Sequence, residues 1–378
     1  MNRHKNHAGL RRPSCRSWRL ACLVALACAG SMLLPSVTQA QGLAASTSPE
    51  RQATEAAIER ALQFLLTQQN ESGAITQGQH TTTMTALAIM ALASTGVTPA
   101  QEDAKGQAMR KALDFVLLPE QQTDEGYFGQ ADNSRMYGHG IITLMLSEVA
   151  GMGADAEQDQ KIHHACQAGI DLILKAQRHA KQGPNRGGWR YTPDAVDADL
   201  SVSVWQLMAL RSAKNDGLDV PDGAIEQAIG YLKRSCTSPL NADGQPQREE
   251  SGFHYTPGGS DIQFAMTAAG VLAMQVCGQY DSPLVTQATT WLKKNPPAWG
   301  TRYFLYGTYY YAQGMHQQGG PTATDAERIV RELLLPKQNP DGSWSPEGEE
   351  GAGGPIYATC MAVLSLSVNY HYLPIYQR

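Results

Sequence analysis

Two kinds of helical segment alternate along the chain. One kind carries an apolar stripe at helical spacing and charge on its other face; in the first such segment Ile58, Leu62 and Leu65 lie on the stripe. These amphipathic segments are residues 54–69, 106–118, 162–178, 224–234, 284–294 and 325–335. The other kind is apolar nearly all round and rich in small residues, over residues 83–93, 140–150, 200–212, 262–277, 303–313 and 356–368.

A helix that is apolar on every side is buried on every side, whereas an amphipathic helix has one face in water. The alternation therefore predicts two concentric rings, with the apolar helices inside and the amphipathic helices outside. A helix pair cannot bury its own apolar face, so neighbouring pairs must stack. Six pairs can close into a ring that leaves no exposed end.

The loops inside the pairs share a polar stretch, a glycine and then an aromatic residue. The glycines are Gly73, Gly126, Gly187, Gly252 and Gly342, the aromatics that follow are Tyr127-Phe128, Trp189, Phe253 and Trp344, and Trp299-Gly300 is a degenerate sixth copy. Glycine permits the positive φ that a sharp reversal needs, and the aromatic ring can plug the helix ends beneath it. We therefore predict an all-α fold, an (α/α)6 toroid of six helix-pair repeats that forms a single domain over residues 54–378.

The N-terminus predicts export. Residues 1–40 hold six Lys or Arg and no acid, followed by an apolar run at 20–34 and small residues before Gln41. This arrangement is typical of a secretory signal peptide, with an uncleaved membrane anchor as the alternative. A linker at 41–53 would follow, and no later segment is apolar for long enough to span a membrane. We expect a periplasmic or extracellular protein.

Charge limits the classes of binding partner, and the cysteine content bears on disulfide formation. Beyond residue 40 the chain carries 24 basic and 35 acidic residues, a formal charge of −11 that disfavours a nucleic-acid groove. A protein partner stays open. Four cysteines remain after the signal, Cys166, Cys236, Cys277 and Cys360, at positions typical of apolar helix faces. We expect buried free thiols there, with a disulfide as the alternative in an exported protein.

One repeat carries a resemblance to a known superfamily. The run Gln338-Asn339-Pro340-Asp341-Gly342-Ser343-Trp344 is similar to the Gln-to-Trp repeat motif of squalene–hopene cyclases, and weaker copies occur in the other loops. The chain as a whole resembles the α/α toroids of terpene cyclases and protein prenyltransferases. This resemblance implies a squalene-cyclase-like protein that binds or cyclises an apolar isoprenoid or another lipid, without a cofactor.

The cyclases protonate a double bond with the middle Asp of an Asp-x-Asp-Asp-Thr motif. Asp197-Ala198-Asp199-Leu200-Ser201 looks similar, so the resemblance implies that Asp199 is the proton donor and Asp197 its partner. Leu200 departs from the third Asp of the motif. A second carboxylate and burial can raise the pKa of such an acid. The alternative is that Asp199 only caps the helix that follows it.

The prenyltransferases in this superfamily hold zinc with Asp, Cys and His on inner helices. Here Ala358 occupies the His position in Tyr357-Ala358-Thr359-Cys360, and the preceding inner helix begins Arg302-Tyr303-Phe304, without Asp-x-Cys. We expect no metal site. The acidic loop with Glu347, Glu349 and Glu350 is expected to be solvated.

A toroid opens where its inner helices begin, and residues near these starts are candidates for ligand binding. The candidates are His80, Tyr137, His139, Trp189, Tyr191, Phe253, Asp261, Gln263, Tyr303, Tyr306, Trp344 and Tyr357. Their aromatic rings can stabilise a carbocation, stack on sugars or fill a core.

Three functions stay open: a cyclase-like enzyme with Asp199 as acid, a non-catalytic exported ligand-binding or scaffold toroid, and a carbohydrate-active (α/α)6 enzyme with Asp199 and Asp261 as its carboxylates. A deep apolar opening with Asp199 bonded to Asp197 would favour the first. A filled opening, or Asp199 turned onto its own helix N–H groups, would count against it.

Overall fold

The computed structural model describes residues 48–179 and 181–377. The signal at 1–40 and most of the linker at 41–53 lie outside these residues, so both stay predictions. The residues from 47 onward form one compact unit. In its described part the outer wall consists of α1 (Pro49–Thr67), α3 (Ala104–Val116), α5 (Ala156–Arg178), α7 (Asp222–Arg234), α9 (Pro283–Lys294) and α11 (Gly320–Leu334). The inner wall consists of α2 (Thr81–Ala93), α4 (Arg135–Glu148), α6 (Leu200–Asn215), α8 (Phe264–Val276), α10 (Phe304–Gln318) and α12 (Gly354–Leu366).

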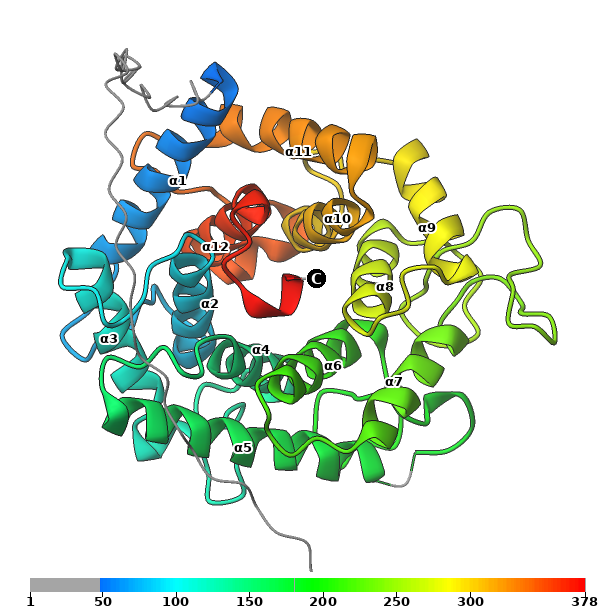
Figure 1. Ribbon diagram of the computed structural model, residues 1–378, viewed down its shortest axis with the longest axis horizontal. Coiled ribbons are helices and arrows are strands. Elements are labelled where there is room, and N and C mark those ends of the chain that lie inside the picture. Colours follow the sequence, from blue (N-terminus) through cyan, green and yellow to red (C-terminus); the bar gives the residue numbers. More distant parts are fainter. Residues whose placement is uncertain (1–47, 180, 378) are drawn as a thin grey trace, which may run out of the picture. The chain divides into compact units, whose positions relative to one another are not determined.

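The two walls form closed concentric rings (Figure 1). Each inner helix contacts the next one along the chain, and α12 contacts α2, which closes the inner ring. Each outer helix from α3 onward packs on the inner helix before it, and α1 packs on α12. The described residues contain isolated β-bridges but no strand. The predicted (α/α)6 toroid is confirmed, and its helices start within six residues of the predicted positions.

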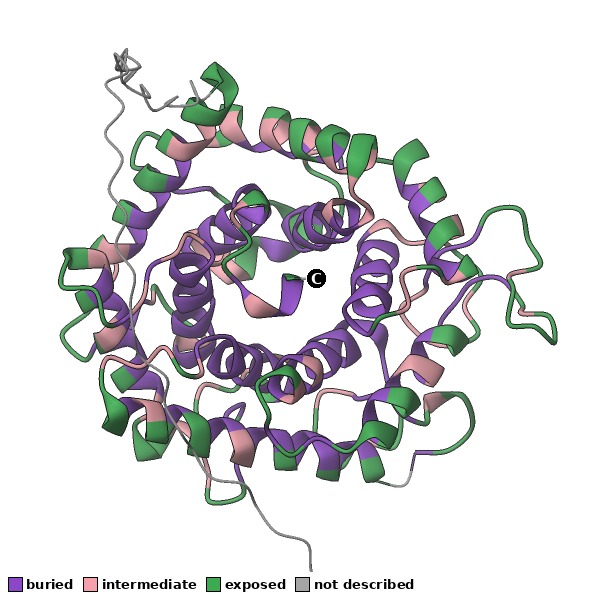
Figure 2. Ribbon diagram, viewed as in Figure 1, coloured by how far each residue is buried: buried purple, intermediate pink, exposed green. Residues whose placement is uncertain are grey.

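Burial follows the sequence pattern. Every residue of α2 from Thr82 to Ala93 is buried, and the inner helices are almost wholly buried in Figure 2. The outer helices expose one face and bury the other, as α7 does with Ile225, Ala228 and Leu232 on its inner side. Cys166, Cys236, Cys277 and Cys360 are free and buried, as predicted. No described helix has the length and apolar character to cross a membrane.

A glutamine at the end of an outer segment ties each of four repeats to the next outer helix. Gln69 Nε2 donates to the carbonyls of Gly73 (2.9 Å) in its own loop and Ala108 (2.8 Å) on α3. The same two bonds recur from Gln122, Gln177 and Gln338. Gln338 donates to Ala57 on α1 at 2.8 Å, so this repeated contact also closes the outer ring.

The glycine in this contact leaves no space for a side chain. Gly342 has φ +91°, and a Cβ built there would lie 2.3 Å from the carbonyl oxygen of Arg60. The equivalent contacts at Gly73, Gly126 and Gly187 are equally close. In the fourth repeat Ser251 occupies the position of this glycine. The predicted glycine of that repeat, Gly252, is therefore one residue too far along the chain.

The residue two places after this glycine, or after Ser251 in the fourth repeat, fixes the loop against the inner helix. Its backbone N–H donates to a side chain on that helix: Trp189 to Ser203 Oγ, Phe253 to Thr267 Oγ1 and Trp344 to Thr359 Oγ1. The indole Nε1 atoms of Trp189 and Trp344 donate to the carbonyls of Ile173 (2.9 Å) and Leu334 (2.8 Å) on the outer wall. The Trp189 and Trp344 rings therefore link the loops to the outer wall, and they pack against the helix ends as predicted.

Candidate functional site

The inner helices begin at one end of the ring, which we call the mouth. The loops before neighbouring helices contact one another there. Met136 N–H donates to the Tyr191 carbonyl (3.0 Å), and Leu200 N–H donates to the Tyr255 carbonyl (2.8 Å). Leu305 N–H donates to the Glu350 carboxylate at 2.9 Å. The neighbouring starts therefore lie at the same level, where the sequence placed its candidate site.

Asp199 is fully buried and is the N-cap of α6. Its Oδ1 accepts from the Val202 N–H (2.9 Å) and the Ser201 hydroxyl (2.7 Å). The second oxygen, Oδ2, lies 3.4 Å from Arg190 Nη1. Asp197 is more than half exposed and ion-pairs with Arg190 Nε at 3.5 Å. Asp199 is thus turned onto its own helix, and both aspartates face the same arginine.

Two effects oppose each other at this carboxyl. Burial raises the pKa of Asp199, because it penalises the charged form. The Val202 N–H, the Ser201 hydroxyl and the Arg190 guanidinium hold the pKa back, because each stabilises the anion. A proton on Asp199 would displace one of these donors or face a cation.

Arg190 is held between two aromatic rings at the mouth. Its guanidinium carbon lies 5.3 Å from the ring centre of Tyr191 and 5.6 Å from that of Tyr255. The two tyrosine hydroxyls are 2.8 Å apart and hydrogen-bonded. Both rings are half-buried and so present part of their surface to solvent. Tyr255 was expected in a loop beside the opening, whereas Arg190 was missed by sequence reasoning, although it lies between the predicted candidates Trp189 and Tyr191.

Glu350 is a second buried carboxylate at the mouth. It accepts from the N–H groups of Leu305 and Tyr306 and from the Tyr357 hydroxyl, each at 2.9 Å. It thereby caps α10 from the loop before α12. The expectation that this acidic loop is solvated is wrong for Glu350, because the first N–H groups of α10 need an acceptor and no residue of its own loop supplies one.

Strained backbone marks three inner-helix starts. His80 and Tyr303, the residues before α2 and α10, have φ of +58° and +54°, and Arg135, the first residue of α4, has φ of +59°. His80 Nδ1 lies 3.0 Å from the Asp132 carbonyl, and the Asp132 carboxylate accepts from Thr83 N–H at 2.9 Å. Asp132, which the sequence did not single out, therefore caps α2 from the neighbouring loop.

The interior of the inner ring, which we call the lumen, holds a cluster of aromatic rings. Trp205 on α6 stacks on Tyr309 on α10, with centroids 5.9 Å apart and planes at 8°. Tyr137 on α4 lies 6.4 Å from Tyr306 on α10. Because α4 and α6 are not neighbours of α10 in the ring, these contacts cross the lumen. Tyr310 contacts Trp205 and Tyr309 and completes the cluster.

The other end of the lumen receives the end of the chain. The Tyr376 hydroxyl is hydrogen-bonded to the Tyr309 hydroxyl. The Ile375 N–H donates to the carboxylate of Glu148 at the end of α4. In Figure 1 this segment lies at the centre of the inner ring. The lumen is therefore filled from both ends rather than forming a deep apolar opening.

The predicted ligand-binding residues divide into four groups. Four are fully enclosed in the walls: His139, Trp189, Phe253 and Trp344. Tyr306 is buried in the lumen; His80, Tyr137, Tyr191, Gln263 and Tyr357 are half-buried at the mouth. Tyr303 and Asp261 are exposed.

His139 is buried between the walls, and both of its ring nitrogens have hydrogen-bond partners there. Nδ1 accepts from the Phe128 N–H at 3.3 Å, and Nε2 lies 3.1 Å from the Gly169 carbonyl. Burial lowers the pKa of His139 to about 4, so the ring is neutral. The enclosed residues hold the two walls together and do not face the mouth.

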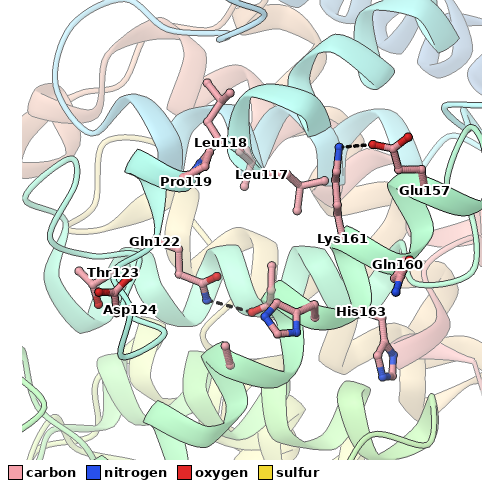
Figure 3. Close-up of a pocket in the computed structure, with 14 residues that line it drawn as sticks. Leu117, Leu118, Pro119, Gln122, Thr123, Asp124, Glu157, Gln160, Lys161 and His163 are labelled. Carbon is pink, nitrogen blue, oxygen red and sulfur yellow. Dashed lines mark hydrogen bonds and ion pairs between the residues drawn. The ribbon is translucent and has the colours of Figure 1, made fainter.

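A separate groove of about 730 Å³ lies on the outer wall (Figure 3). Its apolar side comes from the end of α3, with Leu117 and Leu118, and its polar side from α5, with Glu157 and Lys161 ion-paired at 2.8 Å. None of the predicted site residues lines it. Across the described ranges no group of three or more His, Cys, Asp or Glu is placed to hold a metal ion.

Solved structures with the same architecture have different activities. An inactive variant of an α-1,6-mannanase from Salegentibacter sp., in complex with α-1,6-mannotriose, matches with a TM-score of 0.58 and 10% identity over 85% of this chain and 99% of that one. A type II terpene cyclase from Scytonema matches with a TM-score of 0.53 and 18% identity over 85% of this chain and 100% of that one. A protein from Actinoplanes matches with a TM-score of 0.52 and 16% identity over 84% of this chain and 99% of that one.

No protein-family model and no curated protein matches the sequence. At these identities the matches show the fold alone. They confirm the predicted toroid and its resemblance to terpene cyclases at the level of architecture.

Proposed function

We propose that this protein is an exported ligand-binding toroid that does not use Asp199 as a catalytic acid. The observation that carries the proposal is the orientation of Asp199, whose carboxylate accepts from Val202 N–H and Ser201 and faces Arg190. A Brønsted acid of the cyclase type must be protonated and must face its substrate. Asp199 is enclosed, and its neighbours stabilise the anion.

The filled lumen supports the same conclusion. A cyclase needs room for a folded hydrocarbon, but Trp205 stacks on Tyr309 across the ring, and Tyr306 reaches across it to Tyr137 and to the Ser201 carbonyl. The ligand is therefore expected at the mouth, on the half-buried rings of Tyr191 and Tyr255.

The chemistry of the mouth favours a ligand with both apolar faces and polar groups. Tyr191 and Tyr255 offer ring faces and hydroxyls, and Arg190 and the exposed Asp197 offer charge beside them. Such a combination suits a carbohydrate or a lipid headgroup better than a pure hydrocarbon.

Cyclisation of an isoprenoid is the second candidate. Burial raises the pKa of Asp199, as an acid of this type requires, and the Tyr137 and Tyr306 rings lie close by. The fold is shared with a terpene cyclase. If Arg190 moved away when a substrate entered, Asp199 could take up a proton.

Carbohydrate cleavage is less well supported than carbohydrate binding. The solved inactive mannanase carries asparagine in place of two consecutive aspartates, and this chain contains no two consecutive aspartates. The pair suggested by the sequence, Asp199 and Asp261, combines an enclosed carboxylate with an exposed one. A glycosidase needs both carboxylates beside the scissile bond.

The test compares the wild type with Asp199→Asn on squalene and shorter isoprenoid hydrocarbons, with product analysis by gas chromatography and mass spectrometry. Asparagine retains the cap, so the variant stays folded. We expect no cyclised product from either protein. A product formed by the wild type and lost in Asp199→Asn would overturn the proposal in favour of the cyclase.

A further inference from the structure

Two histidines that are far apart in the sequence meet at the end of the inner ring opposite the mouth. His316 lies in the last turn of α10. His371 follows the 3-10 turn Val368–Tyr370 within residues 368–377, which we call the C-terminal segment. The Nε2 atoms of the two rings are 3.1 Å apart. His371 is exposed and His316 is half-buried, so the pair is open to solvent.

The separation of the two nitrogens fits ligands of one metal ion. Zinc–imidazole bonds are about 2.05 Å long, so two such nitrogens on one ion lie about 2.9 Å apart at a right angle and about 3.3 Å apart at the tetrahedral angle. The observed 3.1 Å falls between these values. Without an ion, the same separation allows one hydrogen bond between the rings.

The tilt of the rings favours the metal geometry. Imidazoles joined end to end by a straight N–H···N bond of this length would have centroids about 5.4 Å apart. Rings whose Nε2 atoms point at one shared ion would have centroids about 4.8 Å apart. The observed centroids of the His316 and His371 rings are 4.7 Å apart, with the ring planes at 56°. The pair is therefore arranged more like two ligands of one ion than like a straight hydrogen bond.

Contacts that do not involve either imidazole hold the pair in place. Gln317 Nε2, on the residue after His316, donates to the Tyr376 carbonyl at 2.6 Å. Tyr376 is itself buried, which anchors the C-terminal segment. Gln377 Nε2 donates to the His371 carbonyl at 2.8 Å. Both imidazoles are thereby positioned before an ion arrives, which lowers the entropic cost of binding.

The chemistry of the pair selects the class of ion. Neutral imidazole binds Zn²⁺, Ni²⁺ and Cu²⁺, and among these Cu²⁺ forms the strongest complexes. Within the part of the chain that the structure describes, no group of three or more His, Cys, Asp or Glu is placed to hold a metal ion. Water would therefore complete the coordination, which leaves the ion exchangeable.

We propose that His316 and His371 bind one divalent transition-metal ion, Cu²⁺ most tightly, and that the ion fastens the C-terminal segment to α10. The site lies at the end of the ring away from the mouth, so the inference does not rest on the function proposed above.

Calorimetric titration of the untagged full chain with CuCl₂, and with ZnCl₂ for comparison, tests the site. His316→Gln and His371→Asn each remove one ligand, and asparagine tolerates the left-handed backbone of His371, where φ is +54°. His164→Gln, at an exposed histidine of α5, is the control. The wild type and the control are expected to bind one more ion than either single variant, at least about tenfold more tightly than the remaining histidine binds it.

The double variant distinguishes one shared ion from two independent sites. If both imidazoles hold the same ion, His316→Gln combined with His371→Asn loses no more tight binding than either change alone. Additive losses would overturn the proposal, because each histidine would then bind its own ion. Equal binding by the wild type and both single variants would also overturn it, since the pair would then be a hydrogen bond only.

Urea unfolding in the presence of ZnCl₂ tests whether the ion stabilises the folded chain. At free Zn²⁺ about 100 times the measured dissociation constant, the equilibrium constant for unfolding of the wild type should fall by at least about tenfold and at most about 100-fold. This fall should be absent in His371→Asn, which changes an exposed position and leaves folding without metal unaltered. Equal stabilisation of the two proteins by Zn²⁺ would place the ion elsewhere and refute the site. If His316→Gln fails to fold, the comparison with His371→Asn still decides.

Discussion

Gly342 lies where the last loop meets the first outer helix, so its replacement tests the closure of the ring. Alanine at φ +91° costs about 1 kcal/mol in backbone strain. Its Cβ would also lie 2.3 Å from the Arg60 carbonyl oxygen, so the loop and α1 must separate by more than half an ångström. Overpacking of this kind costs about 2 kcal/mol. We therefore expect Gly342→Ala to lower the free energy of unfolding by about 3 kcal/mol.

Gly217 provides the matched control. It has φ +84° in the turn after α6, and a Cβ built there meets nothing within 4 Å. Gly217→Ala therefore carries the strain without the overlap and should lose about 1 kcal/mol. Urea denaturation followed by circular dichroism measures both variants. Equal losses would refute the reasoning, because the contact between the loop and α1 would then contribute nothing beyond backbone strain.

Three further variants test individual contacts. Gln122→Ala removes two bonds, to the Gly126 and Ala165 carbonyls, and should lower the free energy of unfolding by about 2 kcal/mol in urea, whereas the exposed Gln63→Ala should change it by less than about 0.5 kcal/mol. Because burial lowers the pKa of His139 to about 4, the wild type should lose stability as the pH falls from about 6.5 towards 4, and His139→Thr should lose less in urea titrations at these pH values. Because burial raises the pKa of Glu148 to about 8, stability should fall as the pH rises from about 4.5 to 8, by more than about 2 kcal/mol, and Glu148→Gln should reduce this fall. Unchanged pH profiles in the two variants would contradict these assignments.

The sequence was sufficient for the architecture because the architecture is periodic. Apolar residues at helical spacing identified the outer helices, and segments that are apolar all round, such as 83–93, identified the inner ones. The Gly–aromatic loops gave the number of repeats. The one register error, Gly252 for Ser251, arose because the fourth repeat has serine at the position of the loop glycine.

The site was harder to predict because its contacts are not periodic. The motif around Asp199 was visible, but the direction of its carboxylate depends on Arg190 and on a free helix N-terminus. Contacts across the lumen, such as Trp205 with Tyr309, join helices that are not neighbours in the ring. No local pattern reports such pairs.

Residues 368–377, the C-terminal segment, could not be placed from the sequence for the same reason. They have no equivalent in the other repeats, so the repeat pattern does not predict where they lie. The buried partner of Ile375, Glu148, resembles an ordinary charged residue at a helix end in the sequence. Its burial follows only from the path of the chain back into the ring.

Native mass spectrometry of protein purified from its own host tests the central claim most directly. The comparison is between the wild type, Tyr191→Ala at the mouth, and Tyr372→Ala, which alters an exposed tyrosine of the C-terminal segment. The account predicts a bound molecule in the wild type and in Tyr372→Ala, and at least a tenfold lower occupancy in Tyr191→Ala with unchanged thermal stability. Equal occupancy in all three proteins, or no bound molecule in any of them, would contradict a ligand site at the mouth.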